Sequence, residues 1–275
     1  MSGAPTLNST LNIALSALQT TQTTLSTVSH NISNVNTEGY VRQQVINGNV
    51  ALGGFGGGVN ITEIRQVVDR FLEGRITGQT SVVGYAQTQS DFFDNIEVIF
   101  GTPGSDASTE KVIGKFFNDL ANLANAPDST SLQLNAVKNG EFVVQSITGI
   151  ATEIQAAQQR ADDQINESID EVNEAIKKIF DLNNEIVTLG MSSNGGANAN
   201  DLLDERQRQV NTVAKHLNVN VLVDGLNRLS LTTETGRKLV DSSYVQLERI
   251  APTPPSTFQD VGLRPIGNDG TPSTT

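Results

Sequence analysis

The side chains best suited to acid–base or metal chemistry are two histidines, His30 and His216, and the carboxylates Asp201, Asp204 and Glu205. A metal centre or a general acid–base pair needs several such groups to converge on one point. The histidines lie in unrelated patterns, and neither has a second histidine at helical spacing. The carboxylates crowd the predicted first turn of a helix, where negative charge stabilises the helix dipole. Capping and solvation are therefore favoured, and we predict no catalytic residue and no metal ligand.

A glycine-rich segment, residues 47–58, raises the possibility of a phosphate-binding loop. Such a loop is followed by Gly-Lys-Ser/Thr and lies between a strand and a helix, and this segment has neither feature. The favoured interpretation is a flexible loop or a glycine-permissive connection between strands. The chain has no cysteine, which excludes disulfides, thiolate catalysis and cysteine-ligated metals. We therefore predict no cofactor.

Composition limits the remaining classes of protein. The chain has 275 residues, of which 37% are hydrophobic and only 5% aromatic, so long helices with narrow apolar faces fit better than a large enzyme core. A formal net charge of -12 argues against nucleic acid or an anionic membrane surface as partner. No segment approaches the roughly 20 apolar residues that span a bilayer, and the N-terminus lacks the pattern of a cleaved signal peptide.

The first element predicted along the chain is a helix over residues 1 to about 35, with an apolar seam from Leu7 to Val35. Apolar residues recur there at steps of four and three, with Thr21 in the one polar place, which predicts a coiled-coil seam about 40 Å long. The seam consists of Leu7, Leu11, Ala14, Leu18, Leu25, Val28, Ile32 and Val35. A single coiled-coil strand is marginal alone. The helix therefore needs a partner helix, and nothing else in the chain is obviously reserved for it.

The helix is followed by a turn and a strand. Asn34, Asn36, Thr37 and Gly39 interrupt the helical pattern, because asparagine competes for backbone hydrogen bonds and glycine adopts positive φ without strain. Residues 40–46 then alternate with a period of two, as a strand does. A long seam that ends in a sharp turn and a strand indicates a segment that packs against other elements and carries no catalytic site.

Two further helical segments precede a rod. A weak helical pattern covers residues 66–100, a loop is predicted over 101–108, and a helix over 109–125 that stops at Pro127. The residues of that last helix expected to point inward are Val112, Ile113, Phe116, Phe117, Leu120 and Leu123. Ser129 is expected to cap a much longer helix, and the seam from Ile147 to Leu189 would run roughly 60 Å.

The seam of this rod falls into two stretches separated by one additional four-residue step, which relaxes a supercoil locally. The first stretch contains Ile147, Ala151, Ile154, Gln158, Ala161 and Ile165, and the second Ile169, Val172, Ile176, Ile179, Asn183 and Ile186. Asn183 is a polar seam residue of the kind that fixes register at a cost in stability.

The last part of the chain predicts a small α/β portion. Residues 190–200 resemble a linker, residues 201–217 an amphipathic helix, and short strands alternate around Asp224-Gly225 and Thr235-Gly236. After Ala251 five prolines predict a boundary or a loose end. The predicted fold class is mainly α, an elongated long-helix coiled-coil bundle with a small β-hairpin portion at its outer end. The predicted domains are 1–40, 41–190 and 191–275.

Residues 31–43, NISNVNTEGYVRQ, resemble the N-terminal signature of the axial proteins of the bacterial flagellum, which are rod, hook and hook-associated proteins. Because Arg42-Gln43 follows the Gly-Tyr pair, the segment is most similar to the family of hook-associated protein 1, the hook–filament junction proteins. Residues 182–186, 198–210 and 218–225 resemble the same family, and rod and hook proteins lack the second of these blocks. Members continue into an outer β-rich portion and a C-terminal helix that pairs with the N-terminal one, so we expect this chain to be the N-terminal part of a longer protein.

The resemblance implies a structural subunit that bridges hook and filament and catalyses no reaction. It implies as partners other copies of the chain, the hook protein, the adjacent hook-associated protein and the flagellar export apparatus. It also implies an extracellular location after export without a cleaved signal. The expected subunit-interface residues are Leu7, Leu11, Leu18, Leu25, Val28, Ile32, Asn31, Asn34, Asn36, Gly39, Tyr40, Arg42 and Gln43. The alternatives are a rod or hook protein, a secreted coiled-coil adhesin or effector, and an enzyme, which would need a cleft with convergent polar groups.

Overall fold

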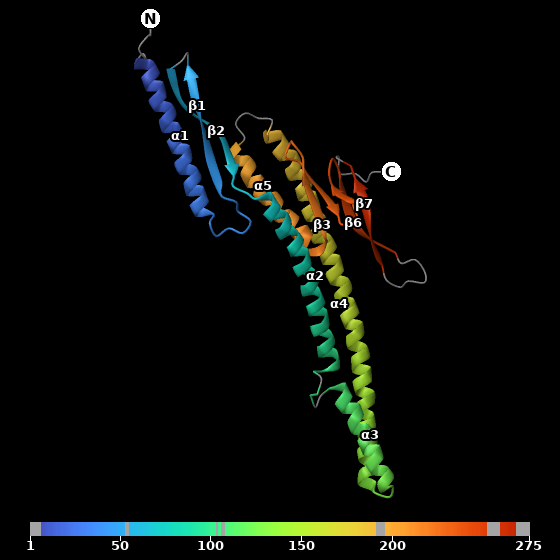
Figure 1. The fold of residues 1–275 in the computed structure, drawn as a ribbon. Helices are drawn as coiled ribbons and strands as arrows, with labels where there is room; N and C mark the ends of the chain where they lie inside the picture. Colours follow the sequence, from blue (N-terminus) through green and yellow to red (C-terminus); the bar gives the residue numbers. More distant parts are fainter. Residues whose placement is uncertain are drawn as a thin grey trace. The chain divides into compact units, whose positions relative to one another are not determined.

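The computed structural model describes residues 7–52, 55–102, 104–105, 108–190, 196–251 and 259–267. These residues are mainly helical, with small antiparallel sheets, which confirms the predicted fold class. The chain divides into two compact units (Figure 1): Met1–Val82 with Glu171–Thr275, and Val83–Asp170. Helices α2 and α4 contribute to both units.

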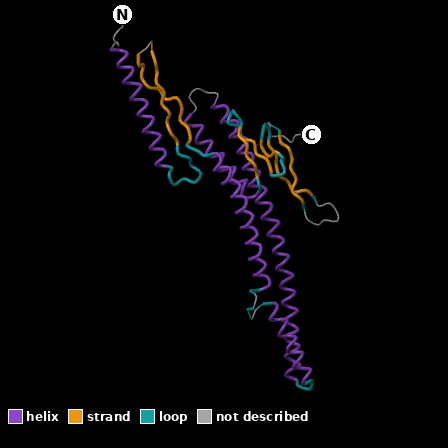
Figure 2. The backbone as a smooth tube through the Cα atoms, in the orientation of Figure 1, coloured by secondary structure: helices purple, strands orange, loops and turns teal. Residues whose placement is uncertain are grey.

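The first unit begins with α1 (Leu7–Ser33), which ends two residues before the predicted seam does. An antiparallel hairpin of β1 (Gln43–Leu52) and β2 (Phe55–Gln66) packs along α1 (Figure 2). Of the two interpretations of residues 47–58, the flexible loop is therefore wrong and the glycine-permissive strand segment fits; residues 53 and 54 lie outside the described residues. Glycine is needed here because a side chain at Gly58, where φ is +107°, would collide with the Ser16 hydroxyl of α1.

Helix α2 (Arg70–Phe100) follows β2 after three residues. Its start lies four residues beyond the predicted one, because Gln66 still pairs with Gln43 across the hairpin. The Asp69 carboxylate accepts hydrogen bonds from the backbone N–H groups of Phe71 and Leu72, at 3.0 and 3.2 Å, and so satisfies two free donors of the first helical turn.

The second unit contains the C-terminal part of α2, all of α3 (Thr109–Asn125) and the N-terminal part of α4 (Thr130–Gly190). The bounds of α3 agree with the prediction, and the Ser108 side chain caps it by accepting from the Lys111 N–H. Phe116 packs against Gly140 of α4. Phe117 and Leu120, which were expected to point inward, are exposed, because the apolar residues of α3 extend farther around the helix than the face that α4 covers.

Helix α4 contains both stretches of the predicted rod seam, but only the second is buried. Val172, Ile176 and Ile179 are almost inaccessible to solvent, whereas Ile147, Ile154 and Ile165 are exposed. The buried stretch belongs to the first unit, where α5 (Gly196–His216) and the larger sheet supply the rest of the core. Helix α5 begins at Gly196 and not at Asp201, so the predicted linker is shorter than expected and its residues 191–195 lie outside the described residues.

The larger sheet is an antiparallel meander in the order β3-β4-β5-β6-β7. Its strands are β3 (Val219–Val223), β4 (Leu229–Thr233), β5 (Lys238–Val240), β6 (Tyr244–Ile250) and β7 (Asp260–Ile266). The hairpins expected around Asp224 and Thr235 are confirmed. The expectation of an unpacked end after Ala251 is wrong for residues 260–266, which form β7; Pro265 is tolerated because β7 is an edge strand.

Two asparagines of α4 join the helix to this sheet. The side-chain amide of each makes two hydrogen bonds to one strand residue, as a residue on a neighbouring strand would. Asn183 donates from Nδ2 to the Leu229 carbonyl at 2.8 Å and accepts from the Leu229 N–H at 3.0 Å. Asn173 makes the same reciprocal pair with Leu247, at 2.9 and 2.7 Å. Both backbone groups of a strand residue are thereby satisfied by one amide. Asn183 thus fixes the position of β4 on the helix.

Candidate subunit interface

Helix α1 carries two opposite faces, and the polar one is turned toward the hairpin. The Ser16 hydroxyl accepts the Val59 N–H at 3.3 Å, and Thr20 and Thr27 are buried. The Thr27 hydroxyl donates to the carbonyl of Thr23 in its own helix, so burial leaves it with a hydrogen-bond partner. Small hydroxyl side chains and Gly58 of the hairpin allow the helix and the strands to approach closely.

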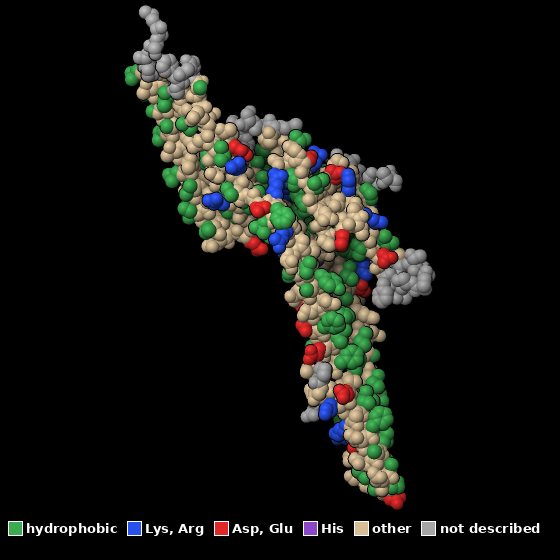
Figure 3. Space-filling view, in the orientation of Figure 1, with side chains coloured by type: hydrophobic (Ala, Val, Ile, Leu, Met, Phe, Trp, Pro, Cys, Tyr) green, Lys and Arg blue, Asp and Glu red, His purple; other side chains and the backbone are tan. Residues whose placement is uncertain are grey.

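The apolar face of α1 is exposed to solvent (Figure 3). We call it the leucine stripe; it consists of Leu7, Leu11, Leu18, Leu25, Val28, Ile32 and, just beyond the helix, Val35. The exposed fraction of these side chains runs from 45% at Val28 to 83% at Leu7. A contiguous row of exposed large apolar side chains marks an interaction surface in a soluble protein.

The polar face follows the same four-and-three steps as the leucine stripe. It contains Ile13, Ser16, Thr20, Thr23 and Thr27. The two series are offset by two residues, which is about 200° around a helix of 3.6 residues per turn. Sequence reasoning followed the apolar series alone. The second series, with Ser and Thr at identical spacing, was the signal that the hairpin would cover that side.

The turn after α1 is held by the side chain of Asn31. Its Nδ2 donates to the Gln43 carbonyl and its Oδ1 accepts the Gln43 N–H, both at 2.9 Å. The Tyr40 hydroxyl donates to the same Oδ1 at 2.8 Å. Gly39 adopts φ +74°, and a Cβ there would lie 2.7 Å from the Arg208 side chain, so both backbone angle and space require glycine. The signature residues thus build a rigid turn.

Helix α5 attaches the hairpin and the turn to the rest of the first unit through polar contacts. Asp204 is buried and accepts hydrogen bonds from the Val41 N–H at 3.2 Å and from Gln66 Nε2 at 2.7 Å. Asp201 accepts from Gln43 Nε2 at 3.0 Å. Asn200 donates from Nδ2 to the Ile64 carbonyl at 2.9 Å. The interpretation of these carboxylates as caps is therefore wrong, because the helix begins at Gly196. Their expected solvation is wrong for Asp204, which is buried, whereas Asp201 is exposed.

The environment of Asp204 changes its acidity. Burial raises the pKa of the Asp204 carboxyl to about 6, and Asp201 contributes in the same direction. The Val41 N–H, the Arg208 guanidinium and the Gln66 amide act in the opposite direction. Burial also raises the pKa of the Tyr40 hydroxyl, and the charges of Asp201 and Asp204 add to this effect.

We expect the free energy of unfolding to depend on the protonation of Asp204. Between pH 7.5 and 5 the folded carboxyl takes up a proton that the unfolded one does not bind, so lower pH favours the folded state. Relative to the Asp204→Asn variant, the chain should gain on the order of 1–2 kcal/mol over this range. Urea unfolding of both proteins at the two pH values measures the difference. A difference that does not vary with pH would contradict the assignment.

The residues expected at a subunit interface fall into two groups. The six apolar ones belong to the leucine stripe and are accessible. Asn31, Tyr40 and Gln43 bond to one another, while Asn36 and Arg42 are exposed and the Asn34 amide donates to the His30 carbonyl at 3.1 Å. Their use between subunits stays a prediction.

The residues suited to catalysis lie apart. His30 packs edge-on against the Tyr40 ring, and His216 lies 3.0 Å from a Glu171 oxygen. Within the described ranges no group of three His, Asp or Glu side chains could hold a metal ion. Likewise, none of the described helices contains an apolar window long enough to cross a bilayer.

The structure thus presents a helix with an exposed leucine stripe, a turn held by Asn31 and a hairpin held by α5. Comparison with known proteins identifies the family of the chain. The family model of the flagellar hook-associated protein FlgK helical domain matches residues 93–274, and that of the flagella basal body rod protein matches residues 11–40. The chain belongs to the FlgK family. The match covers α3, α4, α5 and the larger sheet, and the rod motif covers most of the leucine stripe and the turn.

Relatives of the FlgK family come from distant bacteria. Flagellar hook-associated protein 1 of Salmonella typhimurium is 27% identical over 242 residues, which is 86% of this chain and 43% of the relative. That of Bacillus subtilis is 26% identical over 211 residues, 71% of this chain and 41% of the relative. The chain therefore spans less than half the length of these curated relatives. A solved structure of the hook junction protein FlgK from Burkholderia pseudomallei is 21% identical with a TM-score of 0.46, over 72% of this chain and 33% of that one.

Proposed function

We propose that this FlgK-family chain is part of a structural subunit that assembles at the junction between flagellar hook and filament. The leucine stripe carries the proposal, because it is an apolar face that the described chain leaves uncovered. In an assembled tube, helices of the same or neighbouring subunits would bury it, and burial of a Leu side chain contributes about 2 kcal/mol. The polar clamp between α5 and the hairpin would hold the stripe in a fixed orientation.

The proposed role is mechanical, with copies of the same chain, the hook protein and the adjacent hook-associated protein as partners. It supposes export through the flagellar apparatus and an extracellular location. The match of the rod-protein motif to residues 11–40 keeps a rod or hook position as the second candidate. The match of the FlgK helical domain to residues 93–274 favours the junction.

Substitution of the leucine stripe tests this proposal. We expect the triple variant Leu11→Ser, Leu18→Ser, Leu25→Ser to be absent from isolated hook–basal bodies and to leave cells without filaments. These side chains are exposed, so the purified variant should keep the melting temperature of the unchanged protein. Immunoblots of hook–basal bodies and motility in soft agar measure the effect.

A matched triple variant, Asn12→Ala, Gln19→Ala, Ser26→Ala, changes exposed neighbours that point about 100° away from the stripe. It should assemble normally. Incorporation of the serine variant would rule out the stripe as the assembly surface. Immunogold labelling of the unchanged protein along the rod or hook, and not at the junction, would favour the second candidate.

A further inference from the structure

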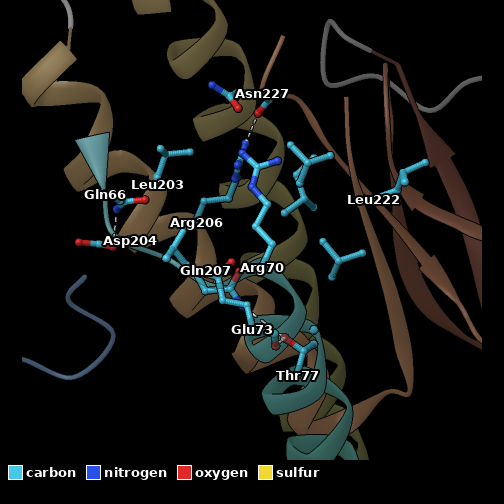
Figure 4. Close-up of a pocket in the computed structure, with 15 residues that line it drawn as sticks. Gln66, Arg70, Glu73, Thr77, Leu203, Asp204, Arg206, Gln207, Leu222 and Asn227 are labelled. Carbon is cyan, nitrogen blue, oxygen red and sulfur yellow. Dashed lines mark hydrogen bonds between the residues drawn. The ribbon is translucent and has the colours of Figure 1, made fainter. Parts of the chain in front are cut away.

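A cavity of about 280 Å³ lies in the first unit beside β3 (Figure 4). Its walls come from the start of α2, from α5 and from β3, with Val68, Leu203 and Val221 among the apolar residues. The volume corresponds to on the order of nine water molecules at about 30 Å³ each, which is enough for a side chain of moderate size. Gln66 and Asp204, which hydrogen-bond to each other between the hairpin and α5, also line it.

Arg206 reaches the cavity from α5 and is only partly satisfied. Its side chain is 5% exposed, and Nη1 donates to Asn183 Oδ1 at 2.9 Å and to the Asn227 carbonyl at 2.6 Å. Within the described part of the chain, Nε and Nη2 have no hydrogen-bond partner and no carboxylate pairs with the guanidinium. A buried cation of this kind favours an anionic ligand.

Arg70 brings a second guanidinium to the same cavity from the first residue of α2 (Figure 4). Arg70 is exposed, and among the residues that the structure describes no hydrogen bond or ion pair engages it, although its charge acts on Glu73. Burial and the charge of Arg70 lower the pKa of Arg206 to about 10, while the charges of Glu73 and Asp224 act in the opposite direction. Glu73 also lines the cavity; burial raises the pKa of its carboxyl, and the charges of Arg70 and Arg206 act in the opposite direction. Among the described residues, no carboxylate lies at ion-pair distance from either of the two guanidinium groups that face this space.

The neighbouring strand β3 is the free edge of its sheet. Hydrogen bonds at Asp224 and Asn218 show that even-numbered residues of β3 pair with β4. The N–H and C=O groups of Val221 and Val223 therefore point away from β4, and both residues line the cavity. An edge with free backbone groups accepts an added strand.

We propose that this cavity binds the carboxylate of an Asp or Glu side chain on an extended segment of another polypeptide that pairs with the edge of β3. The two guanidinium groups supply several N–H donors and positive charge, which suit a carboxylate. The free backbone groups and the apolar walls suit a peptide more than a small free acid. This inference does not depend on the leucine stripe or on its role in assembly.

Binding of two synthetic peptides to the purified chain tests the proposal. The first is a fluorescein-labelled, terminally blocked Thr-Val-Glu-Val-Thr peptide, and the second has glutamine in place of glutamate. We expect the Glu peptide to bind about tenfold more tightly or better in a fluorescence anisotropy titration, as a charge-assisted bond predicts. Equal affinity of the two peptides would overturn the carboxylate site.

Variants distinguish the site from general charge attraction. Arg70→Gln should lower the affinity for the Glu peptide at least about fivefold and leave that for the Gln peptide unchanged. Arg75→Gln, on the same helix but stacked on Phe71, should change neither. An equal effect of both substitutions would overturn the proposal.

Two further measurements test the strand edge. Val221→Pro removes one outward N–H while keeping the bonds to β4, so it should weaken both peptides, with thermal melting as the check on folding. Unchanged binding to this variant would overturn pairing with β3. Glutarate that competes with the same affinity as the Glu peptide would also overturn the peptide assignment in favour of a small free acid.

Discussion

Replacement of Asn183 by alanine is expected to lower the free energy of unfolding of the first unit by about 3–5 kcal/mol. The Asn183 amide satisfies the N–H and the carbonyl of Leu229 and accepts from Nη1 of Arg206. Its truncation leaves two backbone groups and a buried guanidinium without this partner. An unsatisfied buried polar group costs about 1–3 kcal/mol, and a charged one costs more.

Asn184→Ala is the matched control, because Asn184 is the exposed next residue of the same helix. It should change the unfolding free energy by less than about 0.5 kcal/mol. The chain has no Trp, and Tyr244 packs on Phe180 within the first unit with ring centroids 5.1 Å apart. The near-ultraviolet circular dichroism of tyrosine in urea therefore follows this unit. A loss below about 1 kcal/mol for Asn183→Ala would show that solvent replaces the amide.

The role of Asn183 shows where sequence reasoning stops. Its place in the four-and-three series predicted a polar residue that fixes register, and the structure places it in a buried helical seam. The partner was out of reach, because a backbone group 46 residues later leaves no trace in local periodicity. The same holds for Asn31 and Asn173, whose amides bond to the backbone of Gln43 and Leu247.

Helices were predictable because apolar periodicity is a local property, and α3 follows its predicted bounds. Strands rich in glycine or proline were not predictable in the same way. Residues 55–58 appeared flexible, yet they belong to β2, and the close approach of α1 requires a glycine at position 58. β7 contains Pro265 and is stabilised by pairing with β6, which a propensity argument does not include.

Only part of the candidate interface could be predicted from the sequence. The leucine stripe was visible from residue types, and its exposure follows from the hairpin on the opposite, hydroxyl-bearing face of α1. The burial of Asp204 was not visible, because it depends on where the hairpin meets α5. Charged residues at a predicted helix start look the same whether solvent or a distant strand covers them.

Ile176→Asp is expected to cost about 4 kcal/mol or more, because it places a carboxylate where the native side chain is 0% exposed. The nearest side chains on the seam of α4 are Val172 and Ile179, which are also buried and offer no hydrogen-bond donor. A carboxylate there either remains ionised without a partner or is protonated at a cost in free energy. Unfolding in urea, followed by far-ultraviolet circular dichroism, which reports the helices of both units, measures the loss.

Ile147→Asp provides the control within the same helix and the same predicted seam. Ile147 is 54% exposed, so a carboxylate at this position stays hydrated and should cost less than about 1 kcal/mol. Equal losses for the two variants would mean that helix propensity, and not burial, determines the effect, since both substitute Asp for Ile in a helix interior. We expect Ile176→Asp to cost more than Ile147→Asp because only the second stretch of the seam is buried. Hydrophobic side chains stabilise a fold only where another element removes them from water.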